Sequence, residues 1–244
     1  GCIENLYLTD VNVCSTGDFV GGLVGINGGT LKNCHVTGTV KGDAYVGGIV
    51  GYNYMYPGGA TYRNCGFVWD SSVDVNVYGV EQVGGLVGLS ETNVERSYAT
   101  GEVTGKAYLG GLIGYNTGSG DNSYTTAYVT NTTNVASTAP DFFNQISQAS
   151  CTGGLVGRNT GSLSNSYSAG AVTTSMNLSG VNGFMSGTVG KNCYYDYEAS
   201  LFSKPSEANK FYDSAKTTAE MKSAEMAALL NKGGDVWRYK STLN

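Results

Sequence analysis

The sequence predicts an all-β protein, a right-handed parallel β-helix of about six coils that ends in a capping helix. Three observations lead to this fold. A glycine-rich apolar segment recurs five times, a half-buried strand pattern recurs between its copies, and no helical pattern separates them. With 41% hydrophobic residues the chain has enough apolar material for a packed core, so its 37 glycines do not indicate a disordered linker.

The first repeated element is Val-Gly-Gly-Leu-Val-Gly at residues 20–25. Its first glycine recurs at spacings of 26, 37, 26 and 43 residues, so the short spacing is the repeat unit and the longer ones contain insertions. Because the element is apolar on both faces, we expect a strand whose glycines allow tight bends or close backbone approach. The other copies lie at residues 46–51, 83–88, 109–114 and 152–157, with a decayed sixth at 181–186.

The second repeated element lies between copies of the first, at residues 33–40, 96–103 and 165–172. Its side chains alternate with period two. In the first copy Cys34 and Val36 fall on one face, and the more polar residues fall on the other. The element is therefore predicted to be a half-buried strand.

One repeat of about 26 residues thus contains a strand, a Gly/Asn turn, a second strand and a Thr-Gly turn. A unit this short cannot bury its own apolar face, so successive copies must stack. Stacked coils of parallel strands meet that need, with equivalent residues about 4.8 Å apart. A propeller is the less favoured arrangement, because its blades need roughly 40 residues and four strands each.

These residues carry a family resemblance. The run Gly-Gly-Leu/Ile-Val/Ile-Gly, followed in four copies by Asn27, Asn53, Asn116 and Asn159, resembles the GLUG repeat of bacterial surface and secreted proteins. The resemblance covers about residues 1–197. It implies a β-helical module of the kind found in adhesin-like proteins and in the non-catalytic part of immunoglobulin A1-cleaving metallopeptidases. It implies no reaction.

Three of the six cysteines fall at one position of the second element. Cys34, Cys65 and Cys193 stand where other copies have serine, in a column of small residues that we expect to face inward. Buried free thiols are the favoured interpretation. A disulfide between Cys34 and Cys65 is the alternative, because neighbouring coils are within disulfide range.

Asparagines recur at the predicted turns. Asn tolerates the left-handed backbone conformation, and its amide can bond to the next Asn in the stack, so we expect asparagine ladders with a structural role. The two sets are Asn27, Asn53, Asn116 and Asn159, and Asn33, Asn64, Asn122, Asn165 and Asn192.

Aromatic residues supply the candidate binding sites. An outward column next to the Cys/Ser position predicts an exposed strip, either for packing between coils, which we favour, or for contact with sugar rings or another apolar ligand. Its members are His35, Tyr98, Tyr124, Tyr167 and Tyr194, continuing from Tyr7. The insertions add exposed aromatics that could contact a partner or glycan or cover the core locally. These are Tyr54, Tyr56, Tyr62 and Trp69 around the first insertion, and Phe142 and Phe143 in the second.

The pattern changes after residue 197, so we divide the chain into a β-helix at residues 1–197 and a C-terminal cap at residues 198–244. A capping box, Thr217 to Glu220, begins an amphipathic helix predicted over about residues 218–231. A cap is expected because the end of a β-helix exposes apolar residues and unpaired strands. A membrane-surface helix is less favoured, since the charges on this helix are mixed.

The sequence offers little chemistry for catalysis. His35 is the only histidine, which excludes HExxH zinc chemistry, and the glycine runs do not have the strand-to-helix context of a phosphate-binding loop. The carboxylates are interpreted as solvated turn residues, less often as part of a Ca²⁺ site. Those considered are Asp70, Asp74 and Glu81 in one segment, and Asp18 and Asp43 at turns of adjacent coils.

We therefore expect no cofactor and no metal. The net charge of −5 argues against nucleic acid as a partner, and no apolar run suits membrane insertion. The expected protein is a monomer, or part of a longer chain, at the cell surface or secreted, that binds a host or cell-surface protein or glycan without catalysis. The alternatives are a non-catalytic recognition or spacer region of a larger secreted peptidase, and a carbohydrate-active β-helix enzyme that uses Asp70 or Asp74.

Overall fold

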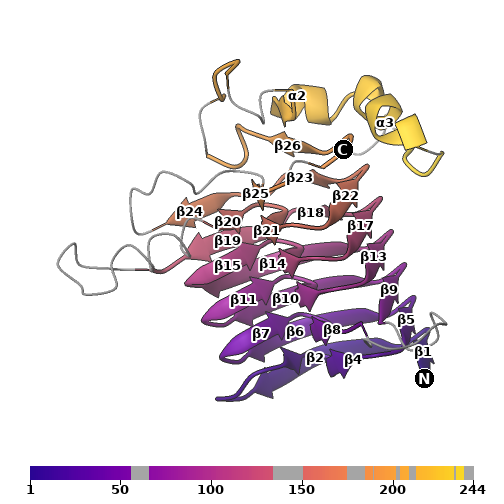
Figure 1. The fold of residues 1–244 in the computed structure, drawn as a ribbon, viewed down its shortest axis with the longest axis vertical. Coiled ribbons are helices and arrows are strands. Elements are labelled where there is room, and N and C mark those ends of the chain that lie inside the picture. Colours follow the sequence, from indigo (N-terminus) through magenta and orange to yellow (C-terminus); the bar gives the residue numbers. More distant parts are fainter. Residues whose placement is uncertain are drawn as a thin grey trace.

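The computed structural model describes residues 1–55, 66–133, 151–174, 185–188, 190–201, 204–208, 213–233 and 235–238. These residues form four sheets in which every strand pair is parallel, together with two short α-helices. Strands of successive repeats stack from the N-terminal to the C-terminal end of the molecule, where α2 and α3 lie (Figure 1). The all-β class is confirmed, and the stacked parallel strands are consistent with the predicted β-helix.

The sheets are named A to D in the order in which the chain visits them. Sheet A consists of β1 (Cys2–Glu4), β5 (Thr30–Lys32), β9 (Phe67–Trp69), β13 (Asn93–Glu95), β17 (Ser119–Asp121) and β22 (Ser162–Ser164). Sheet B consists of β2 (Tyr7–Cys14), β6 (His35–Lys41), β10 (Ser72–Tyr78), β14 (Tyr98–Gly105), β18 (Tyr124–Thr125), β19 (Tyr128–Asn131), β23 (Tyr167–Ser168), β24 (Val172–Thr174), β26 (Tyr194–Asp196) and β27 (Ala215–Lys216).

The other two sheets are shorter in strand length. Sheet C consists of β3 (Val20–Gly21), β7 (Ala44–Gly47), β11 (Glu81–Gly84), β15 (Ala107–Gly110) and β20 (Thr152–Gly153). Sheet D consists of β4 (Val24–Asn27), β8 (Val50–Asn53), β12 (Val87–Ser90), β16 (Ile113–Asn116), β21 (Val156–Asn159) and β25 (Met185–Gly187). We number the repeats accordingly: β1–β4 is repeat 1, β5–β8 repeat 2, β9–β12 repeat 3, β13–β16 repeat 4, β17–β21 repeat 5, and repeat 6 begins at β22.

The register places equivalent residues of the glycine-rich element side by side. Val83 pairs with Val46 on one side and with Leu109 on the other, and Gly84 pairs with the corresponding glycines. The alignment of the copies by sequence is therefore the alignment of the strands in space.

The glycine-rich element forms two strands, not the single strand that its apolar run predicts. In repeat 2 it is divided between β7 and β8, which belong to sheets C and D, and the chain turns the corner at Gly48 and Ile49. Ile49 is buried in the core, and a Cβ on Gly48 would overlap the carbonyl oxygen of Gly85 in the next repeat. The glycines thus allow the close approach that the sequence predicts. The prediction of two strands per repeat is wrong, because most repeats have four.

The second element is a half-buried strand, as predicted. In β6, Val36 and Val40 are fully buried, whereas Thr37 and Thr39 between them are partly exposed. Gly38 has a φ of 127°, and β2 and β6 shift register beside it. The inward valines and leucines of all four sheets form one core.

A ladder of asparagines lines the corner between sheets D and A. Asn27 Nδ2 donates to Asn53 Oδ1 at 2.9 Å, and Asn116 Nδ2 donates to Asn159 Oδ1 at 2.8 Å. Ser90 takes the place of Asn in repeat 3, and its hydroxyl donates to the carbonyl of Thr92, so Asn116 Oδ1 has no partner among the described residues. The first predicted set thus forms a ladder, with this one break. The second set does so only in part: Asn192 Nδ2 donates to Asn165 Oδ1 at 2.9 Å, whereas Asn122 donates to Asp121.

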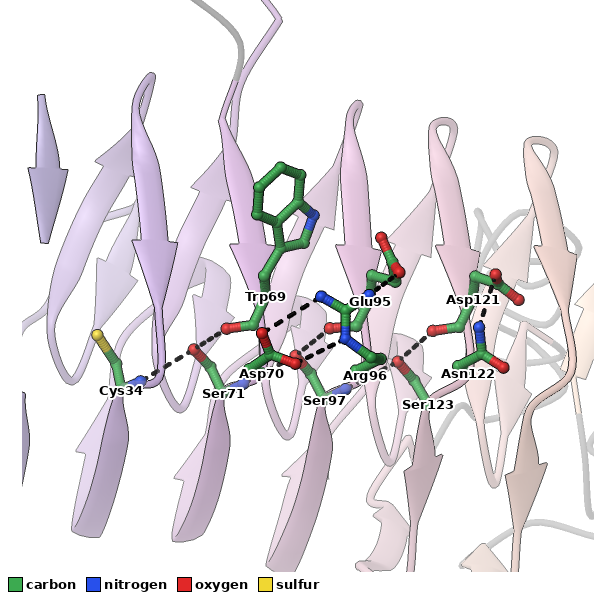
Figure 2. Close-up of polar contacts among 10 residues, drawn as sticks. All are labelled: Cys34, Trp69, Asp70, Ser71, Glu95, Arg96, Ser97, Asp121, Asn122 and Ser123. Atoms are coloured by element: carbon green, nitrogen blue, oxygen red, sulfur yellow. Dashed lines mark hydrogen bonds and ion pairs between the residues drawn. The ribbon is translucent and has the colours of Figure 1, made fainter. Parts of the chain in front are cut away.

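A second ladder, of small side chains, lies at the corner between sheets A and B (Figure 2). The backbone N–H of each member donates to the hydroxyl of the next, with N···O distances of 3.1 Å, and that hydroxyl donates to a carbonyl two residues earlier in its own repeat. Its members are Cys34, Ser71, Ser97, Ser123 and Ser166. Burial raises the pKa of the Cys193 thiol to about 12, against an opposing hydrogen bond from the Ser166 backbone.

One assignment to this column was wrong. Ser71 and Asp70, not Cys65 and Asn64, stand beside Cys34 and Asn33, because Lys32 pairs with Trp69. The sequence around Cys65 resembles that around Cys34, but the insertion lies before β9, so the residue equivalent to Cys34 is found after β9 and is Ser71. Cys65 and Asn64 are outside the described residues, and Cys34 is a free, buried thiol.

The predicted C-terminal helix is broken in two. The capping box of Thr217 and Glu220 begins α2 (Thr218–Met221), as expected, but Ser223 then caps a separate helix, α3 (Ala224–Leu230), by accepting from the N–H of Met226 at 3.2 Å. A 3₁₀ turn, Asn231–Gly233, follows. Ser223 competes with the helix for backbone hydrogen bonds, which is why one continuous helix over residues 218–231 does not form.

The close approach of repeats at a glycine corner predicts a steep cost for a methyl group. A Cβ on Gly85 would overlap the carbonyl oxygen of Gly111, so we expect Gly85→Ala to lower the free energy of unfolding by about 2–4 kcal/mol. Gly28→Ala is the control, because nothing lies within 4 Å of a Cβ there. Urea denaturation measures both, and equal stability of the two variants would contradict this account.

Burial of Cys193 predicts both its reactivity and a pH dependence. Its thiol should resist alkylation in the folded protein at pH 8, whereas the exposed Cys2 and Cys14 react, as peptide mapping by mass spectrometry can show. An unfolded thiol ionises near pH 9, so folding favours the protonated form, and the free energy of unfolding should fall as the pH rises above about 9. Cys193→Ser should reduce that fall; an unchanged pH profile would refute the assignment.

Candidate functional site

A ladder of aromatic rings lies on the outer side of sheet B, as the sequence predicts. The register aligns Tyr7, His35, Tyr98, Tyr124, Tyr167 and Tyr194. The rings of Tyr98 and Tyr124 stack with centroids 4.9 Å apart, and those of Tyr124 and Tyr167 stack at 5.1 Å. We call this set the tyrosine ladder.

The tyrosine ladder is interrupted in repeat 3 and covered near the C-terminus. Ser72 occupies the ladder position in β10, and its hydroxyl lies 2.8 Å from His35 Nδ1. At the other end, Trp237 contacts Tyr124 and Tyr167 with its ring and donates from Nε1 to the carbonyl of Asn165 at 3.1 Å.

Helix α3 covers the last ring of the ladder. Tyr194 is only 8% exposed, in a cluster with Met226 and Leu230. Burial, and then the charge interaction with Tyr124, raises the pKa of Tyr167. This half of the ladder packs the cap onto sheet B, which supports the packing interpretation over an open platform for sugar rings.

A second set of outward aromatic rings, at the corner between sheets C and D, escaped the sequence reasoning. Phe19 stacks on Tyr45 with centroids 4.7 Å apart, and Tyr52 packs beside both. In repeat 4 the ring centroids of Tyr108 and Tyr115 lie 5.9 Å apart. The sequence feature that could have predicted these rings is the residue just before each glycine-rich run, which is aromatic in three copies. In the structure this residue has a left-handed backbone in four copies.

These rings also pack on one another, although Phe19 stays 37% exposed. The faces of Phe19 and Tyr45 are 12° from parallel, so each covers the other. The guanidinium of Arg158 lies 5.4 Å from the Tyr115 ring centroid. Gln82 and Leu89 stand at the corresponding positions of repeat 3 and interrupt this set, as Ser72 interrupts the tyrosine ladder.

A groove of about 490 Å³ lies at the corner between sheets D and A, beginning at repeat 3. We call it the corner groove. Its principal lining side chains are Met55, Phe67, Glu91, Asn93, Ser119 and Ser162. Gly118 and Gly161 also line it, and they cannot carry side chains, because a Cβ on either would overlap the backbone of the preceding repeat.

Glu91 is held in place at the groove. Its Oε2 accepts from the N–H of Met55 at 3.2 Å, and the Tyr52 hydroxyl bonds to the same carboxylate. Burial, and then this hydrogen bond, raises the pKa of Tyr52.

The structure brings together only some of the predicted binding residues. Trp69 lies on the outer face of β9 (Figure 2). Its ring centroid is 5.1 Å from that of Phe67, and Tyr54 packs edge-on against Tyr52. Trp69 thus contacts Phe67, which lines the corner groove, while the tyrosine ladder belongs to sheet B. The remaining predicted residues lie outside the described part of the chain: Tyr56, Tyr62, Phe142 and Phe143.

The carboxylates considered for catalysis are dispersed. Asp70 pairs with Arg96 across repeats at 2.7 Å (Figure 2), and Asp74, on the outer face of β10, accepts from the Thr100 hydroxyl at 3.0 Å. Glu81 begins β11 in sheet C. Asp18 accepts from the N–H of Ala44 at 3.2 Å, and its register partner is Ala44, not Asp43.

The described residues hold neither a cluster of metal ligands nor a membrane-spanning helix. Among them, no three His, Cys, Asp or Glu side chains lie close enough together to hold a metal ion. In the same part of the chain, neither α-helix is long and apolar enough to cross a membrane.

Comparison with known proteins agrees with the repeat. The GLUG motif matches residues 20–41, 79–104 and 148–173. Halomucin from Haloquadratum walsbyi is 45% identical over 51 residues, which are 21% of this chain and, to the nearest per cent, 0% of halomucin, so the chain spans a negligible part of that protein.

Among solved structures, the chain is similar to a candidate immunoglobulin A1 protease from Bacteroides ovatus, with a TM-score of 0.65 and 18% identity. The similarity covers 94% of this chain and 69% of the other. At that identity it concerns the fold alone.

Trp237 offers a test of how the cap is attached. Because its ring packs on Tyr124 and Tyr167 and its Nε1 is hydrogen-bonded, we expect Trp237→Ala to cost about 2–3 kcal/mol of stability. Residues after Ala215 should then be cut sooner by protease than the sheets. Val236→Ala, at an exposed neighbouring position, is the control; equal protease sensitivity of the two variants would argue against this attachment.

Proposed function

We propose that this GLUG-motif repeat chain is a non-catalytic module of a surface or secreted protein, which presents a binding surface on a rigid frame. In this proposal residues 1–197 form a right-handed parallel β-helix of about six coils, and residues 198–244 form its cap. The ligand is a host or cell-surface protein or glycan, and nucleic acid is not a partner.

The observation that carries the proposal is that the side chains able to do catalysis are bonded to other side chains or to the backbone. The serines at the corner between sheets A and B are bonded in a ladder, the only histidine is paired with Ser72, and Asp70 is paired with Arg96. A nucleophile needs a base within hydrogen-bond reach, and a glycosidase needs two facing carboxylates. The Ser72–His35 pair meets the first requirement, but no third side chain among the described residues is hydrogen-bonded to His35 to orient it. Asp70 and Asp74 are engaged by Arg96 and Thr100.

The extracellular setting rests on the comparisons. The GLUG motif is a repeat found in surface and secreted proteins, and halomucin is by its name a mucin, a class of extracellular protein. These likenesses support a surface or secreted protein.

A second candidate is a recognition or spacer region within a larger secreted peptidase. The fold similarity to the candidate immunoglobulin A1 protease favours it, because the shared fold extends over most of this chain. A carbohydrate-active enzyme is less favoured, since Asp70, Asp74 and Glu81 do not face a common site.

The proposal is tested by separating binding from turnover. The wild-type chain is labelled and applied to immobilised gastric mucin, and the same chain is incubated with a polysaccharide panel and with immunoglobulin A1. We expect saturable binding to the mucin, no new reducing ends and no cleaved immunoglobulin.

Release of sugar that Asp70→Asn or Asp74→Asn abolishes would make the chain an enzyme and overturn the proposal. Absence of mucin binding would favour the spacer role instead. Asn76→Asp, at an exposed position on β10, is a control for the added or removed surface charge.

A further inference from the structure

We propose that the corner groove binds a short, uncharged oligosaccharide. This inference rests on the proposed function and assigns its ligand class and site. The groove has about 490 Å³ of space, within the range of roughly 300–1,000 Å³ that small-ligand sites occupy.

The groove combines an aromatic surface with hydroxyl and amide groups. Phe67 contributes a ring, with Trp69 beside it, and the apolar C–H face of a sugar can pack on such rings. Asn93, Ser119 and Ser162 occupy the same position in successive strands of sheet A. Their side chains thus recur about every 4.8 Å along the groove, as hydrogen-bonding groups for successive parts of an extended ligand.

One acceptor in the groove lacks a partner. Asn93 Oδ1 is inaccessible to bulk water and has no hydrogen bond with any described residue. Leaving such a group unpaired is costly, and a rotation of the Asn93 side chain into the groove would let a ligand O–H or N–H remove that cost. Trp69, whose ring packs on Phe67, likewise has a buried Nε1 without a partner among the described residues.

The charge of the groove selects against anionic sugars. Glu91 is fixed by Met55 and Tyr52 and is the charged side chain of the groove lining. A carboxylate accepts hydrogen bonds from sugar hydroxyls, but it repels a uronate or sulfate.

A peptide is the less suitable occupant. Peptides that bind along sheets usually pair with unbonded backbone groups of an edge strand. Here the backbone is already used: the N–H of Ser119 donates to Thr92, and that of Ser162 donates to Gly118, both at 2.9 Å. The free hydrogen-bonding capacity of the groove is therefore in its side chains, which suits hydroxyl-rich ligands.

Calorimetric titration of the intact chain tests the inference with three probes: cellotetraose, maltotetraose and chitotetraose. We expect at least one to bind with a dissociation constant below about 1 mM. Ser162→Trp, which places a bulky ring at an exposed groove position, should abolish that binding. Asn93→Ala should weaken it about tenfold, since it removes the unpaired acceptor.

Asn76→Trp is the matched control, because it adds the same ring at an exposed position of sheet B, away from the groove, and it should bind like the wild type. Failure of all three sugars to bind the wild type, or binding that Ser162→Trp leaves intact, would overturn the inference. A phage-displayed peptide pool gives a further test. If no sugar binds, and peptides are enriched on the wild type but not on Ser162→Trp, the groove is a peptide site and the inference is wrong.

The mucin assay distinguishes this failure from failure of the proposed function. If wild type and Ser162→Trp bind immobilised mucin equally and neither binds a probe sugar, the groove assignment is wrong and the binding module stands. If Ser162→Trp loses both mucin binding and sugar binding, the result supports the groove assignment and the proposed function.

Discussion

The close approach of backbones at the glycine corners is the constraint on which the rest of this structure depends. At Gly47 and Gly84 a Cβ would overlap a backbone oxygen of the same corner, and atoms of the next repeat lie within 3 Å of the same point. Only a residue without a side chain allows the chain to turn from sheet C to sheet D there while the next repeat stacks directly above. A strand shifted by one residue in either direction would bring Val46 or Ile49 to one of the two glycine positions, where there is no room for a side chain, so the glycine pair also holds the register.

A fixed register places like residues above one another, and ladders follow from it. The asparagines, the serines and the outward tyrosines each bond or stack with their counterparts one repeat away, at the spacing of neighbouring strands. The cost is functional, because a side chain engaged in a ladder is not available to a ligand. Hence the surface left for recognition lies where a ladder breaks or where a corner is hollow.

Repeat 3 is where several ladders break at once. The tyrosine ladder is interrupted by Ser72, and the asparagine ladder is interrupted by Ser90. The aromatic rings at the corner between sheets C and D are interrupted by Gln82 and Leu89. The same repeat supplies Phe67 to the corner groove, and Glu91 follows directly after its last strand. This repeat follows the first insertion of the chain, and its departures from the repeat pattern lie beside the corner groove.

The spacing of the glycine-rich runs was sufficient to predict parallel stacked strands, the asparagine ladder and the alignment of the tyrosines, because a repeated sequence at one-strand spacing must place its copies side by side. It could not show that each run bends into two strands, since the residues before and after the corner are equally apolar. Nor could it show that Ser71 stands beside Cys34, because an insertion hides the register. The groove, too, depends on Phe67, Glu91 and Ser162, which are far apart in sequence and become neighbours only when the repeats stack.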